Sequence, residues 1–315
     1  MIELKNISKS FGSLTAVDDL SLDIGPGELF GFIGPNGAGK STSMKVLACL
    51  LKPDQGKARV DGLDCATEGH EIRARLGYMP DFLGVYDDLT VDEYLQFFAS
   101  AFRIPRKKRR ATTDAVLELT DLTEKRRAMV SSLSRGMQQR LGVARVLIHD
   151  PKVLLLDEPA SGLDPRARIE MRSLLVELRE MGKTLMVSSH ILTELAEMST
   201  SIGIIERGQL VYAGSIADAY KRVRGADRIH IEFEPDTDNP APPAETAQRA
   251  LTGDARIESI EPIGSAIRVQ LTPGDHGRHF LLSALNNAGL RVSAFTPEPV
   301  KLEDAFLTLT KGHVQ

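Results

Sequence analysis

The spacing of apolar residues changes along the chain, and each spacing predicts a different kind of element. Up to about residue 80, apolar and polar side chains alternate, as in Ile2–Lys5 and Leu20–Ile24, with a turn marked by Asp61–Gly62. Alternation with a period of two predicts half-buried strands. From about residue 89 to 144 the spacing becomes helical. There Thr90, followed three residues later by Glu93, predicts a capping box.

Three apolar runs predict strands that are buried on both faces. They are Glu28–Ile33, Val153–Asp157 and Thr184–Ser188. A helix is predicted over Thr42–Leu51, directly after the first run, and an amphipathic helix over Pro165–Met181, between the other two. Strand, helix and strand in this order predict a parallel sheet covered by helices.

Beyond about residue 223 the composition changes, and a second set of elements is predicted. The segment Glu234–Pro243 is rich in proline and acidic residues, so we expect an exposed loop. Around it we expect strands over 228–233, 257–263, 266–271 and 292–297, and helices over 244–251 and 279–288. The order βαββαβ predicts a small ferredoxin-like α/β domain. A final helix is expected over Leu302–Leu309.

Composition narrows the class of protein. Apolar residues make up 42% of the 315 residues and charged residues 26%, which is typical of a soluble globular protein of about two domains. The net charge of -4 gives no reason to expect nucleic acid as a partner. The longest apolar runs, such as Val153–Leu156, are far shorter than the roughly 20 residues of a membrane-spanning helix. Cys49 and Cys65 form no C-x-x-C pair, so we expect reduced thiols and a cytoplasmic chain.

Gly34–Ser41 reads Gly-Pro-Asn-Gly-Ala-Gly-Lys-Ser and matches the phosphate-loop pattern G-x-x-x-x-G-K-[ST] at every fixed position. The glycines allow a backbone nest whose N–H groups converge on an anion, and the helix that follows adds its positive N-terminal end. Lys40 can reach the β- and γ-phosphates, and the Ser41 hydroxyl can bind Mg²⁺. The chain is therefore expected to bind a nucleoside triphosphate. The predicted binding residues are Gly34, Pro35, Asn36, Gly37, Ala38, Gly39, Lys40, Ser41 and Thr42.

Two adjacent carboxylates follow the second buried strand. Asp157 and Glu158 stand where an open parallel sheet places its ligands, at the carboxyl end of a strand. Asp157 is suited to hold Mg²⁺ through water, opposite Ser41. Glu158 lies one residue further on and points differently, so it is the candidate base that orients the attacking water.

The third motif, Leu133-Ser134-Arg135-Gly136-Met137, lies between the other two. With all three in this order, the chain resembles the ATP-binding subunit of ABC transporters, whose signature is Leu-Ser-Gly-Gly-Gln shortly before the strand that ends in Asp-Glu. The resemblance covers roughly residues 1–220. Arg135 and Met137 replace a glycine and the glutamine of the commonest signature, whereas Ser134 and Gly136 remain, so we expect function to survive.

The resemblance implies roles for further residues. Phe11 matches the aromatic residue that stacks on adenine, and Val17 matches the small apolar residue near it. Ser134 and Gly136 match the signature groups that touch the γ-phosphate. His190, which follows the third buried strand, matches the switch histidine that contacts the same phosphate.

Other segments that resemble the family indicate its branch and its contacts. Asp81, a candidate metal ligand, stands where the family usually has glutamine, and an acidic residue there is similar to subunits of the bacterial multidrug and exporter branch. The ending Lys301–Leu307 resembles that of many such subunits. Ser161–Asp164 resembles the loop that crosses the dimer interface. By the same resemblance, Asp81–Phe102 is the expected surface for the membrane subunit.

The expected fold is α/β: a P-loop NTPase core with an antiparallel β subdomain, an inserted helical subdomain at about 82–148, and a small C-terminal domain. We expect the ATP-binding domain over 1–222 and the accessory domain over 223–315. The resemblance implies a homodimer in which each ATP, with Mg²⁺, lies between Gly34–Thr42 of one chain and Ser134–Gly136 of the other. It also implies a separate transmembrane permease, which would hold the chain at the inner face of the membrane.

The expected function is ATP hydrolysis that powers an exporter. The alternative is a soluble ABC ATPase that acts on ribosomes or DNA. Those relatives usually carry two nucleotide units, or a long coiled coil between the motifs, and neither is present here. The C-terminal domain could also be a regulatory ligand-binding module. No residue indicates the transported substrate.

Overall fold

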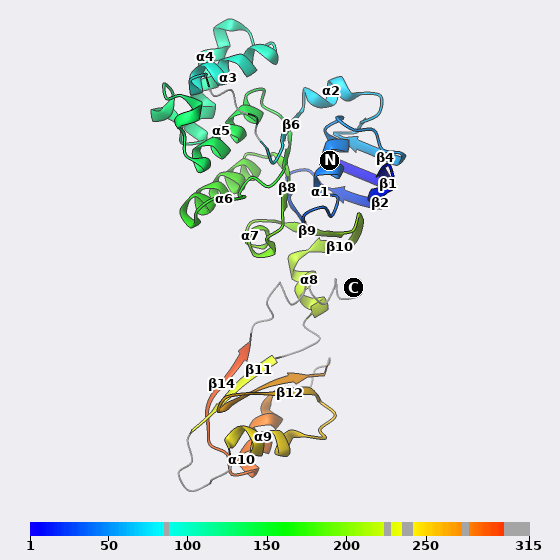
Figure 1. Ribbon diagram of the computed structural model, residues 1–315, viewed down its shortest axis with the longest axis vertical. Helices are drawn as coiled ribbons and strands as arrows, with labels where there is room; N and C mark the ends of the chain where they lie inside the picture. Colours follow the sequence, from blue (N-terminus) through cyan, green and yellow to red (C-terminus); the bar gives the residue numbers. More distant parts are fainter. Residues whose placement is uncertain (83, 85–87, 224–227, 235–241, 273–276, 299–315) are drawn as a thin grey trace. The chain divides into compact units, whose positions relative to one another are not determined.

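The structure is a computed structural model that describes residues 1–315 apart from 83, 85–87, 224–227, 235–241, 273–276 and 299–315 (Figure 1). Contacts divide the chain into two units, Met1–Ile216 and Ala217–Gln315. This division and the boundary predicted after residue 222 both fall within helix α8 (Ile216–Val223). The predicted final helix Leu302–Leu309 and the ending Lys301–Leu307 lie outside the described residues.

The N-terminal unit, Met1–Ile216, contains two sheets. A six-stranded central sheet has the order β10-β9-β3-β8-β7-β6, and its strands are parallel except for the antiparallel edge strand β10. A four-stranded antiparallel sheet has the order β2-β1-β4-β5. The strands are β1 (Ile2–Phe11), β2 (Leu14–Ile24), β3 (Leu29–Ile33), β4 (Gln55–Val60), β5 (Leu63–Asp64), β6 (Leu76–Met79), β7 (Val153–Leu156), β8 (Thr184–Ser189), β9 (Ser201–Glu206) and β10 (Gln209–Ser215).

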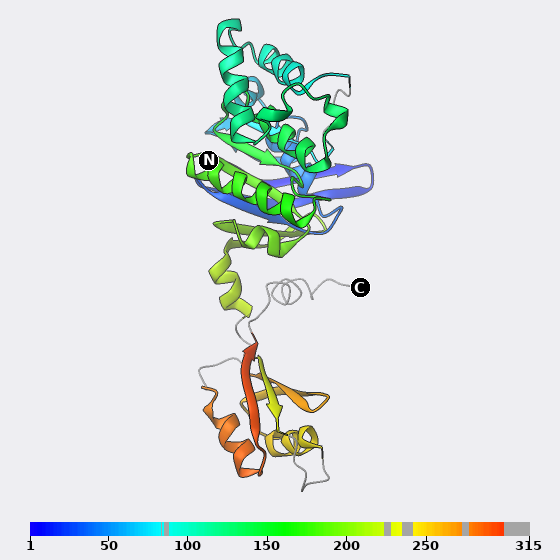
Figure 2. The ribbon, with the colours of Figure 1, turned by 90° about the vertical axis from the view of Figure 1, so that its left-hand side faces the viewer.

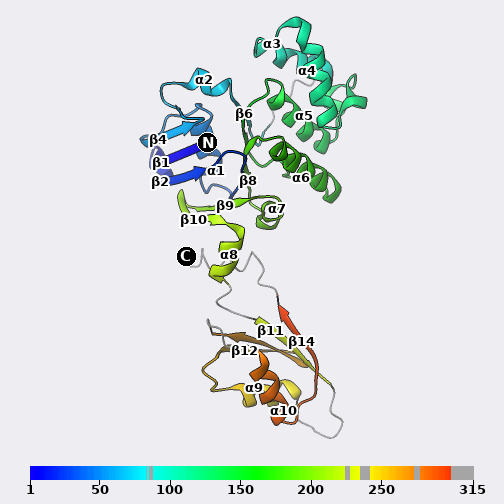
Figure 3. The same ribbon diagram turned by 180° about the vertical axis from the view of Figure 1, so that it is seen from behind.

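Helices cover both faces of the central sheet. Helix α1 lies between the central and the antiparallel sheets, and α5 and α6 lie on the opposite face (Figures 1 and 3). Met44 and Leu47 of α1 belong to a buried cluster with Ile2 of β1 and Phe32 of β3. The helices are α1 (Lys40–Leu47), α2 (Gly69–Arg73), α3 (Val91–Ala101), α4 (Arg106–Leu119), α5 (Arg135–Leu147), α6 (Pro165–Glu180) and α7 (Leu192–Ala196), with 3₁₀ turns at Thr123–Lys125 and Val130–Ser132.

The three buried strands predicted from apolar runs are confirmed. Strands β3, β7 and β8 are buried along their whole length. Their parallel register pairs Ile33 with Ser189 and Leu156 with Val187. Because neighbouring parallel strands end at one edge of the sheet, the segments that follow them meet there. Those segments carry the phosphate loop, Asp157–Glu158 and His190.

Helix α1 is shorter at its C-terminal end than predicted and begins earlier. It spans Lys40–Leu47, whereas the apolar pattern predicted Thr42–Leu51. Gly39 caps its start with φ 108°. Cys49 adopts φ 58°, the left-handed conformation that commonly ends a helix, so the chain turns away while the apolar pattern continues.

The inserted helical region contains α3, α4 and α5, within the predicted span of about 82–148. The predicted capping box at the start of α3 is confirmed. Thr90 Oγ1 accepts from the Glu93 backbone N–H at 3.3 Å, and the Thr90 N–H donates to Glu93 Oε2 at 2.9 Å. Tyr94 and Leu95 are buried on the inner face of α3. In the part of the chain that the structure describes, no helix is both long and apolar enough to cross a membrane.

Beyond α8, the described part of the C-terminal unit is an antiparallel sheet with two helices on one face (Figure 2). Its elements, β11 (Arg228–Phe233), α9 (Pro243–Leu251), β12 (Ile257–Ile263), β13 (Ala266–Leu271), α10 (His279–Asn287) and β14 (Val292–Glu298), follow the predicted order βαββαβ. The strand order is β12-β13-β11-β14. Ile229 and Ile231 of the sheet pack with Ala247 and Leu281 of the helices. The assignment to the ferredoxin-like class stays a prediction.

Candidate functional site

The phosphate loop joins β3 to α1 and is shaped by glycines. Gly37 and Gly39 have φ values of 80° and 108°. A Cβ on Gly39 would lie 2.4 Å from the Ala16 carbonyl oxygen, and one on Gly34 would lie 2.3 Å from that of Ile205. Side chains are therefore excluded at both positions.

The other residues of the loop differ in exposure. Pro35, Asn36 and Gly37 are exposed at the loop tip, and Ala38 is buried beneath it. Ser41 and Thr42 are half-buried in the first turn of α1.

Lys40 lies under the loop with its charge enclosed by oxygen atoms. Its Nζ donates to the carbonyl oxygens of Gly34, at 2.5 Å, and Pro35, at 3.2 Å. The same atom lies 3.4 Å from Glu158 Oε1. The side chain is only 6% exposed. A buried ammonium needs such partners, and a phosphate group would offer stronger ones because it carries negative charge.

The two carboxylates at the end of β7 point in different directions. Asp157 is 2% exposed, and its Oδ1 accepts from the Ser188 hydroxyl at 2.6 Å. The Ser188 oxygen in turn accepts from the Glu158 backbone N–H at 2.9 Å. Glu158 has φ 51°, a left-handed conformation that is uncommon for a residue with a side chain. This turn directs Glu158 toward Lys40 and His190. The role of Ser188, which links the Asp157 carboxylate to the Glu158 backbone N–H, was not predicted from the sequence.

Glu158 and His190 are in direct contact across the ends of β7 and β8. His190 Nδ1 lies 2.9 Å from Glu158 Oε2, and because an ionised carboxylate only accepts, the imidazole N–H is the donor. The other oxygen, Oε1, is buried and makes no hydrogen bond to any described residue. One oxygen of Glu158 is thus held by the histidine, while the second faces the lysine of the phosphate loop.

Asp81 follows β6 and is exposed near the same group of charges. Partial burial raises the pKa of its carboxyl, and the negative charges of Asp157 and Glu158 raise it further. The positive charges of Arg135 and His190 oppose this shift. The structure therefore brings Asp81 into the electrostatic surroundings of the catalytic candidates, although its role as a metal ligand stays a prediction.

The signature residues lie at the start of α5. Ser134 is exposed and caps the helix, since its hydroxyl accepts from the Met137 N–H at 3.4 Å. Arg135 donates from Nε to the Ser161 carbonyl oxygen at 3.2 Å, a contact that the sequence did not predict. Gly136 is half-buried, and a Cβ there would lie 3.1 Å from Ala167 of α6. Among the described contacts, no hydrogen bond joins the signature to the phosphate loop of its own chain.

The two residues expected near adenine have different surroundings. Phe11, at the end of β1, is 48% exposed, and Lys9 Nζ lies 5.7 Å from its ring centroid. This exposed ring is available for stacking. Val17 is fully buried, and a Cβ on Gly39 would lie 3.4 Å from it, so Val17 packs beneath the phosphate loop.

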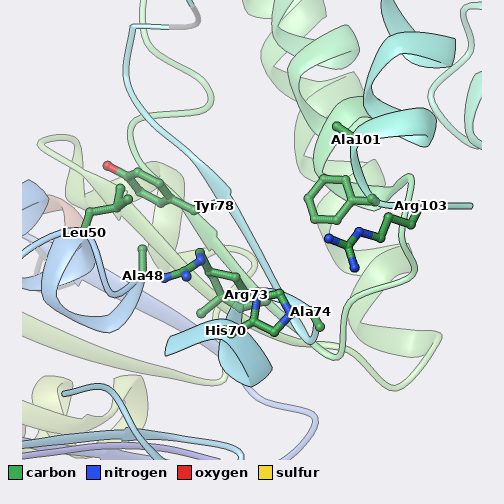
Figure 4. A pocket seen from close by; sticks show the side chains of 10 residues that line it. Ala48, Leu50, His70, Arg73, Ala74, Tyr78, Ala101 and Arg103 are labelled. Carbon is green, nitrogen blue, oxygen red and sulfur yellow. The ribbon is translucent and has the colours of Figure 1, made fainter. Parts of the chain in front are cut away.

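A separate cavity of about 430 Å³ lies away from the phosphate loop. Figure 4 shows Ala48, Leu50, Arg73 and His70 on one side of it and Ala101 and Arg103 on the other. The first group comes from the end of α1 and from α2, and the second from the end of α3. The cavity therefore opens between the nucleotide-binding core and the helical region.

Comparisons with known proteins agree with the order of the motifs. The family model described as "ABC transporter" matches residues 17–161. The "Nod factor export ATP-binding protein I" of Paraburkholderia xenovorans (strain LB400) is 34% identical over 321 residues, which cover 100% of this chain and 98% of that protein. The "Bacitracin transport ATP-binding protein BcrA" of Bacillus licheniformis is 34% identical over 313 residues, covering 99% and 98%.

Solved structures resemble the N-terminal part of the chain. A dimeric bacterial ABC transporter cassette has 26% sequence identity and a TM-score of 0.63, covering 69% of this chain and 99% of that one. The same cassette in a post-hydrolysis state, bound to ADP and Pi, gives the same values.

Proposed function

The chain belongs to the family of ATP-binding subunits of ABC transporters and is an ATPase, and we propose that it powers an exporter through a separate membrane subunit. The observation that carries the mechanism is the contact of Glu158 with both Lys40 and His190 at the phosphate loop. Export is supported by the relatives named for Nod factor export. The alternative, action on ribosomes or DNA, finds no support among the relatives described above.

Glu158 acts in this proposal as the general base. Its buried Oε1 makes no hydrogen bond to a described residue and lies 3.4 Å from Lys40 Nζ, so it can accept from a water molecule once Lys40 turns to the phosphates. An ionised carboxylate placed there can orient a water molecule and accept its proton as the water attacks the γ-phosphorus in line. His190 holds Oε2 and so fixes the direction of the carboxylate. Lys40 exchanges its carbonyl partners for phosphate oxygens and stabilises their charge.

The oxygen atoms of Ser41, Asp157 and Asp81 fit Mg²⁺, which prefers such ligands and keeps several waters. The buried Asp157 is already oriented by Ser188. Within the described ranges, no three His, Cys, Asp or Glu side chains are grouped as a metal site, so phosphate and water would supply the remaining ligands. When bound with ATP, Mg²⁺ would neutralise charge on the phosphates.

A second copy of the chain completes each site in the proposed assembly. Ser134 is exposed at the start of α5, where its helix end and hydroxyl can meet a phosphate of another chain. Arg135 ties this end of α5 to the Ser161–Asp164 loop, so the two segments of one chain would move together. When the phosphate loop of each chain faces the Ser134 end of α5 in the other, the two chains are related by a twofold axis and form a closed dimer. The resemblance to a dimeric cassette supports this arrangement.

The cavity between α2 and the end of α3 is the proposed docking groove for the membrane subunit. It overlaps the expected surface Asp81–Phe102 at Ala101 and Phe102. Its wall combines the apolar Leu50 and Phe102 with the cationic Arg73 and Arg103. This lining fits a short cytoplasmic helix that presents apolar side chains and a carboxylate. Occupation of the groove would place the chain at the inner face of the membrane.

Co-purification tests the proposal. The chain is co-expressed with a candidate membrane subunit, and the complex is reconstituted in lipid vesicles. We expect ATP hydrolysis that depends on the membrane subunit and outward transport that requires ATP. Arg103→Glu should release the membrane subunit while ATP binding is retained. Stimulation of hydrolysis by ribosomes or DNA, without association with the membrane protein, would support the alternative function instead.

A further inference from the structure

The two cysteines of the chain are far apart in sequence but share one acceptor. Cys49 Sγ and Cys65 Sγ each lie 3.7 Å from the Leu47 carbonyl oxygen. Cys49 follows the end of α1, and Cys65 follows β5, so the two thiols come from different elements. Both side chains are partly exposed and pack at the edge of the main core. They therefore form a dithiol pair that a small reagent can reach.

The thiols of the pair differ in their readiness to ionise. A hydrogen bond from the Cys65 thiol lowers the pKa of Cys49, and the positive charge of Arg73 on α2 acts in the same direction. Burial of Cys49 and the negative charge of Asp64 act against it. The same hydrogen bond and burial raise the pKa of Cys65. Cys49 is thus the nucleophile of the pair, since the thiolate is the reactive form.

We propose that Cys49 and Cys65 are a redox-modifiable dithiol site that reacts with small-molecule disulfides and closes to an intramolecular disulfide. The Cys49 thiolate attacks one sulfur of the reagent, forms a mixed disulfide and releases one reagent thiolate. The Cys65 thiol then loses its proton to the solvent and attacks the Cys49 sulfur. The second reagent thiolate leaves, so one reagent disulfide is reduced while one protein disulfide forms.

The position of the pair gives the closure a structural consequence. Gly69, the first residue of α2, packs against Cys49: a Cβ on it would lie 3.2 Å from Cys49 Cβ. Ala48 and Leu50, the neighbours of Cys49, line the cavity together with Arg73 (Figure 4). A disulfide would therefore connect the end of α1 to the segment before α2, directly behind one wall of the cavity.

The test uses glutathione disulfide as the probe on the full chain. Cys49 and Cys65 are the only cysteines, so free-thiol titration and intact mass read the site without background. We expect loss of both thiols, a mass lower by two hydrogens, no retained glutathione and no covalent dimer. Closure should be faster in the native chain than in the chain unfolded in urea, because the fold holds the two thiols together.

Two single variants test the order of the steps. Cys65→Ser should stop at one glutathione adduct on Cys49. Cys49→Ser, the matched control, should leave Cys65 reacting about tenfold more slowly than Cys49 does in the first variant. Two glutathione adducts on the native wild type, an intermolecular dimer, or closure no faster than in urea would each overturn the proposal. If either variant fails to fold, the comparison of closure rates in native and urea-unfolded wild type still tests the proposal.

Discussion

Arg135 lies on Gly162 within a single chain, with its Nε bonded to the neighbouring Ser161 carbonyl oxygen at 3.2 Å. A Cβ on Gly162 would fall 2.5 Å from Arg135 Cζ, and the backbone there has φ 68°. Arg135, which replaces a glycine of the commonest signature, thus occupies space that is free because residue 162 on the adjacent loop has no side chain.

Gly162→Ala should lower the free energy of unfolding by about 1 kcal/mol, mainly because alanine is strained at φ 68°. The clash adds less, because the guanidinium is the flexible end of an exposed side chain and can move. Arg135→Gly has a cost of its own, because it removes the hydrogen bond to Ser161 and puts a glycine at the start of α5. In the Arg135→Gly background, however, Gly162→Ala should cost less than in the wild type, because the guanidinium no longer has to move. Denaturant unfolding of the two single variants and the double variant measures this coupling. Strict additivity of the two changes would show that the packing of the guanidinium on Gly162 has no energetic weight.

Glu158→Gln should reduce ATP turnover by about a hundredfold or more, because the amide cannot accept a proton from the attacking water. ATP binding should persist, since the change leaves Lys40 in place. Turnover and nucleotide affinity are measured separately, with Glu170→Gln as a control on α6, where the carboxylate pairs with Arg166 and Arg140. Normal turnover in the Glu158 variant would remove that residue from its role.

Lys40→Ala should weaken ATP binding by about tenfold or more, because it removes a charge that would otherwise pair with the phosphates. Calorimetry with ATP measures the dissociation constant. Lys45→Ala is the matched control: it lies on the same helix, carries the same charge and is exposed. Equal affinities for the two variants would contradict the assignment of Lys40.

Phe11→Ala should cost about 1 to 3 kcal/mol of ATP affinity, the range observed when an aromatic side chain that stacks on a base is removed. Phe11→Tyr should keep most of the affinity because it keeps the ring. Leu14→Ala, at an exposed position in the next strand, serves as the control. If Phe11→Ala binds ATP like the wild type, the adenine lies elsewhere.

Asp61→Asn should destabilise the chain by about 0.5 to 1 kcal/mol at neutral pH. A hydrogen bond from Arg75, at 2.8 Å, and the charge of Lys152 lower the pKa of the Asp61 carboxyl. Because the pKa of Asp61 is lowered in the folded state, its ionised carboxylate stabilises the fold at pH values above the ordinary aspartate pKa of 3.8. This contribution is lost as the pH falls through the pKa of the folded state. The free energies of unfolding of the wild type and the variant, measured across this pH window, should therefore become equal in acid. A constant difference at every pH would assign the effect to something other than the ion pair.

Sequence patterns predicted the elements wherever a short segment determines its own structure. Buried strands such as Thr184–Ser188 and the capping box at Thr90 depend on neighbouring residues only. The end of α1 was predicted wrongly, because apolar residues continue past Cys49 while the backbone turns there. An apolar pattern carries no information about a single left-handed residue.

The site was predictable where motifs fix residue types and not where packing brings residues together. The phosphate loop, Glu158 and His190 were predicted from their motifs and from their places after predicted strands, and the structure brings them together, while their roles stay predictions. Ser188 gave no such signal, since a serine inside a buried strand is unremarkable until its hydroxyl is seen between the Asp157 carboxylate and the Glu158 backbone N–H. The cavity depends on how α2 and α3 are arranged, which no local pattern determines.

The parallel register of β3, β7 and β8 has a consequence for how the chain can be lengthened. Ile33 and Leu156 are each fixed opposite residues of β8, and the phosphate loop and Asp157 follow directly from them. The residues between β6 and β7 do not set the distance between those two groups. Insertions there, for example in the turn between α4 and α5, should change what the helical region recognises while the spacing of the catalytic groups stays the same. A chain with this sheet register can therefore bind new partners while its catalytic groups keep their positions.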